Sequence, residues 1–198
     1  MEEEYYNRWA KLYYFIDRAY KDEQILHSLD MHNDAVKKGE ASFEGIDRIM
    51  GHIAQVAGED LALCLCKICY DKDSKNNLSR FNAFLQKHYP EHALPTNEFQ
   101  SLKQDESFVS DLIKIRDQWI AHNDYSDANV SLDYKQLWAA LGKVTSLFNR
   151  LCVKEIDERI YPYSEIEIVK TVFDITVQMS NLLRNNQVAP AEKEQCDA

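Results

Sequence analysis

The feature that most constrains the fold is a long N-terminal stretch, residues 1–38, that contains neither glycine nor proline. Large apolar side chains recur within it at intervals of three or four positions: Tyr6, Trp9, Tyr13, Ile16 and Tyr20. An α-helix has about 3.6 residues per turn, so this spacing places these side chains on one face. We therefore predict an amphipathic helix over residues 3–35, favoured at its start by the carboxylates of residues 2–4 and broken by Gly39.

The rest of the chain repeats the helical pattern and has few residues that interrupt it, with five glycines and four prolines in the whole sequence. Its capping and breaking residues predict further helices over residues 42–70, 78–88, 97–123, 133–160 and 164–184. A chain of 198 residues is long enough to bury a sizeable core. We expect one all-α domain over residues 1–184, an antiparallel bundle of four to six helices, followed by a polar, disordered tail over residues 185–198.

A second feature lies in the helix predicted over residues 97–123, where Arg116 precedes His122 by six positions. Arg116 occupies a helical seam between Ile113 and Ile120, where an apolar side chain is expected. A charge on an apolar face is costly unless it is paired or used. Arginine offers a planar fork of donors that stays charged, and histidine exchanges a proton near neutral pH. The two residues together are a minimal metal-free set for phosphate chemistry.

The geometry of an ideal helix leaves two ways to complete such a site. Arg116 and His122 lie about 120° apart around the axis and about 9 Å apart along it, so they do not converge by stacking. Either the helix ends near His122 and the ring turns back, or a second copy of the chain completes the site. A purely structural interpretation also stands, with Arg116 as an ion-pair partner and His122 as a cap of the helix C-terminus.

The residues around this pair resemble a known family. Residues 116–124 read Arg-Asp-Gln-Trp-Ile-Ala-His-Asn-Asp, which is similar to the signature of the HEPN superfamily: Arg, a polar residue, four more residues and His. Residues 65–85, with Cys66-Lys67-Ile68 and Asn77-Leu78-Ser79-Arg80-Phe81, resemble its abortive-infection-associated (AbiU-like) branch. Residues from about 5 to 183 fit the all-helical plan of that branch.

The resemblance implies a metal-independent endoribonuclease of a bacterial antiphage or toxin–antitoxin system. In such an enzyme the ribose 2′-hydroxyl attacks the adjacent phosphate. The catalytic residues are then His122 as general base or acid, Arg116 as the group that holds the phosphate, and Asp117 as the residue that orients one of them. Asn123 and Tyr125 are expected to contact the RNA substrate.

The resemblance also implies a symmetric homodimer that joins two motif helices in one composite site, with Ile115 and Trp119 as candidate interface residues. Core burial within one chain is the alternative for this last pair. An antitoxin or other protein is a further expected partner.

The charge of the chain keeps a second class of function open. The formal net charge is −10, so RNA binding would need a locally basic surface. A non-catalytic helical module that binds a partner protein through an acidic surface is therefore the alternative, and a plain structural bundle is a third possibility. The acidic N-terminus, the short apolar runs and the odd count of five cysteines predict a cytoplasmic protein without a membrane span.

Other candidate sites are weaker. Cys64, Cys66 and Cys69 form a Cys-x-Cys-x-x-Cys cluster, but Cys64 and Cys66 point in nearly opposite directions on a helix. His88 and His92 are separated by Pro90, which disrupts helical zinc geometry. The sequence has no glycine-rich phosphate loop. We therefore expect no metal and no cofactor.

Overall fold

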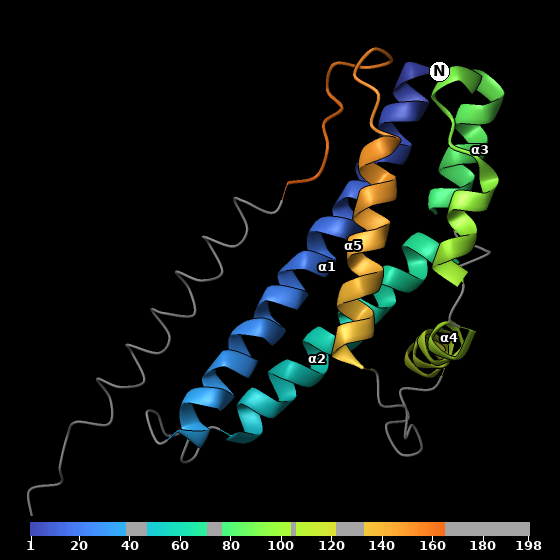
Figure 1. Cartoon of the computed structure of the whole chain (residues 1–198). Coiled ribbons are helices and arrows are strands. Elements are labelled where there is room, and N and C mark those ends of the chain that lie inside the picture. The colour runs from blue at the N-terminus through green and yellow to red at the C-terminus, as the bar shows by residue number, and fades with distance from the viewer. Residues whose placement is uncertain (39–46, 71–76, 104–105, 122–132, 165–198) are drawn as a thin grey trace, which may run out of the picture.

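The computed structural model describes residues 1–38, 47–70, 77–103, 106–121 and 133–164 (Figure 1). All regular elements within these residues are helices, which confirms the all-α class. The five α-helices are α1 (Glu2–Lys37), α2 (Asp47–Leu65), α3 (Leu78–His88), α4 (Glu106–Ala121) and α5 (Tyr134–Arg150).

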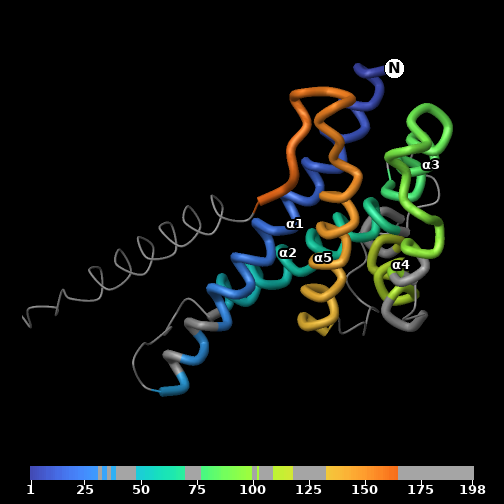
Figure 2. Tube along the Cα trace, turned by 45° about the horizontal axis from the view of Figure 1, so that its top comes forward, coloured from blue at the N-terminus to red at the C-terminus, as the bar shows by residue number. Residues whose placement is uncertain are grey.

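Three long helices form the main body of the molecule. Helix α1 packs along α2, which runs back in the opposite direction, and α5 lies against both of them (Figure 1). Helix α4 contacts α2 but crosses the long helices, so it is seen nearly end-on in Figure 1. Helix α3 lies near the first turns of α1, and the turned view of the Cα trace in Figure 2 preserves these relations.

Helix α1 forms where its pattern predicts a helix, and its apolar seam is the centre of the core. Tyr5, Leu12 and Ile16 are fully buried, and Trp9 is nearly so. The Tyr5 ring stacks on Phe81 of α3, with 5.3 Å between the ring centroids. The buried residues of α1 therefore contact both α2 and α3.

Helix α2 is the described element that most resembles a membrane span. Residues Arg48–Cys69 reach the length and mean hydropathy of such a span, although a core helix passes the same test. Here α2 packs on α1, buries Leu61 and Leu65, and carries Asp60 in an ion pair with Arg18. One helix of this kind is weak evidence for a span, and the described ranges contain no clear membrane span.

The single helix predicted over residues 97–123 is wrong in its first part. A 3₁₀-helix, Thr96–Lys103, precedes α4, which begins at Glu106. In a 3₁₀-helix side chains three apart eclipse one another. Phe99 and Leu102 are three apart and both buried, so the tighter winding places both against the core.

The helix predicted over residues 133–160 is correct at its start and wrong at its end. The Asp133 side chain caps α5 by accepting a hydrogen bond from the Lys135 N–H, at 2.9 Å. The helix ends at Arg150 because a distant hydroxyl binds the backbone that follows. Tyr5 Oη donates to the Leu151 carbonyl and accepts from the Val153 N–H, each at 2.8 Å. Residues 151–164 then run as turns and irregular chain.

The remaining predicted segments differ in whether the structure describes them. The helix predicted over residues 78–88 is confirmed, and the Asn77 side chain caps it by accepting from the Arg80 N–H at 2.8 Å. The last predicted helix and the polar tail lie beyond residue 164, outside the described residues. They stay predictions.

Candidate functional site

The motif arginine lies in the second half of α4. The Arg116 side chain is 22% exposed, while that of Asp117 is 59% exposed. Arg116 donates from Nε and from Nη2 to the same oxygen of Asp117, at 2.9 and 2.7 Å. This contact places the guanidinium of Arg116 beside the Asp117 carboxylate. The catalytic roles of Arg116 and Asp117 stay predictions.

The structure describes only part of the predicted site. Ile115 is half-buried and packs against the hydrophobic core, which is the alternative to an interface position. Trp119 belongs to α4, but its side chain lies outside the described residues. His122, Asn123 and Tyr125 also lie outside them, because the described part of α4 ends at Ala121. The convergence of Arg116 and His122 therefore stays a prediction.

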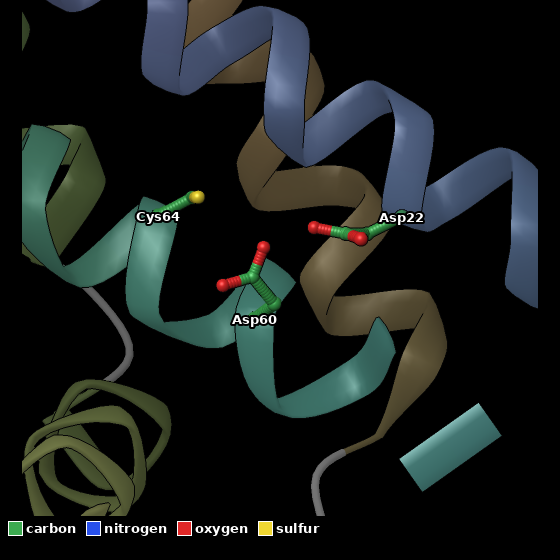
Figure 3. Close-up of side chains that lie close together, drawn as sticks. All are labelled: Asp22, Asp60 and Cys64. Carbon is green, nitrogen blue, oxygen red and sulfur yellow. The ribbon is translucent and has the colours of Figure 1, made fainter. Parts of the chain in front are cut away.

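A second cluster of chemically active side chains lies between α1 and α2. Asp22 projects from α1, and Asp60 and Cys64 project from α2 toward it (Figure 3). Their two carboxylate oxygens and the thiol sulfur all lie within 4.8 Å of one another. Arg18 binds Asp60 through two hydrogen bonds, one from Nε to Oδ2 and one from Nη2 to Oδ1 at 2.6 Å.

Burial dominates the electrostatics of this cluster. Desolvation, helped by the hydrogen bond to Asp60 and by its charge, raises the pKa of Asp22 to about 8. Desolvation also raises the pKa of the Cys64 thiol to about 12, and the two nearby carboxylates add to the effect. The hydrogen bond to Asp60 raises the pKa of Arg18 above its already high value. In the absence of another cation, Asp22 and Cys64 therefore retain their protons at neutral pH.

A separate buried polar contact joins α1 to the start of α5. Glu23 is fully buried and accepts a 2.6 Å hydrogen bond from the Tyr134 hydroxyl at the start of α5. Gln24 donates to the second oxygen of Glu23, at 2.9 Å. Both carboxylate oxygens thus have a donor, and the contact serves to hold α5 against α1.

The two aspartates of the cluster were not among the predicted site residues. The sequence pattern groups Cys64 only with Cys66 and Cys69, and the structure buries those two elsewhere in the core. The available signal was the spacing of Asp60 and Cys64, which lie four residues apart and so share one helix face. Nothing in the sequence indicated that Asp22 faces them.

Comparison of the chain with models of known protein families, with curated proteins and with solved structures found no match.

Proposed function

We propose that this protein is a metal-independent endoribonuclease of a bacterial antiphage or toxin–antitoxin system, acting in the cytoplasm as a symmetric homodimer. The observation that carries the proposal is the placement of Arg116. It is a largely buried arginine, held by a neighbouring carboxylate on a core helix, six residues before a histidine. This pattern resembles the signature of the HEPN ribonucleases.

The chemistry assigned to this pair is an intramolecular displacement at phosphorus. His122 takes the proton of the ribose 2′-hydroxyl, whose oxygen attacks the adjacent phosphate, and the 5′-oxygen leaves with a proton from an imidazolium. Arg116 neutralises the charge that develops on the phosphoryl oxygens. Asn123 and Tyr125 would contact the RNA.

The contact between Arg116 and Asp117 suits a phosphate-binding role. Asp117 is well exposed, and such ion pairs are worth about 0–1 kcal/mol. A bidentate phosphate can therefore replace the carboxylate at small cost while the buried stem of Arg116 keeps its position. Asp117 would orient the arginine before substrate arrives.

RNA cleavage by four purified proteins tests the proposal. Wild type should cleave RNA, and His122→Ala should abolish cleavage because a methyl group transfers no proton. Arg116→Lys should be strongly impaired, because lysine keeps the charge but loses the planar fork. Lys114→Ala is the matched control on the same helix, since Lys114 is 56% exposed and, among the described residues, its ion pair is with the half-buried Asp111. Full activity of both motif variants would contradict the proposal.

The charge of the chain favours one other candidate function, a non-catalytic module that binds a partner protein through an acidic surface. The formal net charge of −10 is the observation behind it. If wild type cleaves no RNA under any condition, and the two motif variants differ from it only in thermal stability, the interaction module replaces the ribonuclease.

A further inference from the structure

We propose that Asp22, Asp60 and Cys64 form a binding site for a zinc-like divalent cation between α1 and α2 (Figure 3). The site is distinct from the motif on α4 and shares no residue with it. The proposal therefore does not depend on the proposed ribonuclease activity.

Helices α1 and α2 supply the ligands from the two sides of the site. Asp60 and Cys64 are one turn apart on α2, and Asp22 faces them from α1. A tetrahedral zinc ion with bonds of about 2.0–2.3 Å holds its ligand atoms roughly 3.3–3.8 Å apart. The three atoms already lie within 4.8 Å of one another. Small side-chain rotations would complete the geometry without moving either helix.

Two observations separate this cluster from an ordinary acidic surface. Asp22 Oδ2 is buried and has no hydrogen-bond partner among the described residues. A buried carboxylate oxygen without a partner is costly, and a bound cation would satisfy it. Cys64 is only 2% exposed, and its thiol points toward the two carboxyl groups (Figure 3).

The charges of the site match a divalent ion. Two carboxylates and one thiolate carry three negative charges, and the guanidinium of Arg18 on Asp60 offsets one of them. The remaining two are the charge of Zn²⁺. Each Asp60 oxygen that Arg18 binds keeps a second lone pair for the cation. Arg18 therefore orients the Asp60 ligand without contacting the metal itself.

The ligand types indicate the class of metal. Thiolate ligands select zinc and similar borderline-soft ions, whereas Mg²⁺ and Ca²⁺ take oxygen ligands alone. Three protein ligands would leave a fourth position for water.

Cobalt(II) titration of the full-length chain, stripped with chelator and kept reduced, tests the site. Co²⁺ bound to a thiolate gives a charge-transfer absorption band that oxygen and nitrogen ligands do not give. Wild type should develop this band and saturate at one equivalent, and Zn²⁺ should displace it. Cys64→Ser should lose the band, whereas Cys152→Ser, at a half-buried cysteine outside the cluster, should keep it. Absence of the band in wild type, or its persistence in Cys64→Ser, would overturn the proposal.

A second variant guards against a folding defect in Cys64→Ser. Asp22→Asn keeps the size of the side chain and a donor for Asp60, so it should fold, yet it removes a ligand. Its affinity for Co²⁺ should fall roughly tenfold or more, and the rise in melting temperature that Zn²⁺ gives wild type should shrink accordingly. An unchanged affinity in folded Asp22→Asn would show that the three-ligand site is wrong.

Discussion

Replacing Asp22 by asparagine should make the metal-free protein less sensitive to alkaline pH. Burial, followed by the hydrogen bond and charge of Asp60, raises the pKa of Asp22 from its ordinary 3.8 to about 8. The folded chain thus holds this proton more tightly than the unfolded chain does. The stability that the protonated group contributes is fully present below about pH 4 and is lost as the pH rises toward 8. Asparagine has no such proton to lose.

The magnitude follows from the change in pKa. Each pKa unit corresponds to about 1.36 kcal/mol, so the rise from 3.8 to about 8 sets an upper limit of about 6 kcal/mol. Asp22 is partly exposed, and screening by solvent reduces that value by roughly half. Between about pH 5 and pH 8.5 we therefore expect wild type to lose about 2 kcal/mol relative to Asp22→Asn.

Urea unfolding followed by circular dichroism, with EDTA present throughout, measures this difference. The free energy of unfolding should be similar for the two proteins near pH 5, and Asp22→Asn should be the more stable near pH 8.5. Asp34→Asn is the matched control for loss of a carboxylate, because Asp34 lies on the same helix and is 58% exposed. Parallel pH profiles for wild type and Asp22→Asn would refute the assignment of a protonated, buried Asp22.

Three further outcomes are expected. RNA cleavage should persist in EDTA, because the proposed chemistry uses no metal; loss of cleavage that a divalent ion restores would contradict it. Light scattering at micromolar concentration should report twice the chain mass of 23.1 kDa, and a persistent monomer would exclude the composite site. Tyr5→Phe should lower the free energy of unfolding in urea by about 2–3 kcal/mol, because two buried backbone groups lose their partner. Tyr6→Phe, at a half-buried ring, is its control; an equal loss in both would show that the Tyr5 hydroxyl is not the cause.

The parts of the fold that could be predicted are those set by local pattern. Helix α1 needed only apolar spacing and the absence of glycine and proline, and α3 and α5 begin where Asn77 and Asp133 cap them. The end of α5 could not be predicted, because the hydroxyl that binds the next turn belongs to Tyr5, 146 residues away from Leu151. Periodicity continues past Arg150, and a tertiary contact overrides it.

Only one of the two candidate sites was visible in the local sequence pattern. A charged side chain on an apolar seam was visible in the sequence, and Arg116 indeed lies partly buried beside Asp117. The cluster of Asp22, Asp60 and Cys64 was not, because it depends on how α1 and α2 are rotated against each other. That rotation is set by the packing of the whole core.

The hydrogen bonds of the Tyr5 hydroxyl join two segments that the ribosome makes at different times. Tyr5 leaves the ribosome well before Val153, the donor to its oxygen, which lies 148 residues later in the chain. At about 5–20 residues per second, the two are separated by about 7–30 s of synthesis. During that interval the first turn of α1 lacks both α5 and the backbone that Tyr5 binds, and its aromatic seam stays uncovered on that side. The nascent chain therefore carries an exposed apolar surface on α1 until α5 and the residues that follow it have been made.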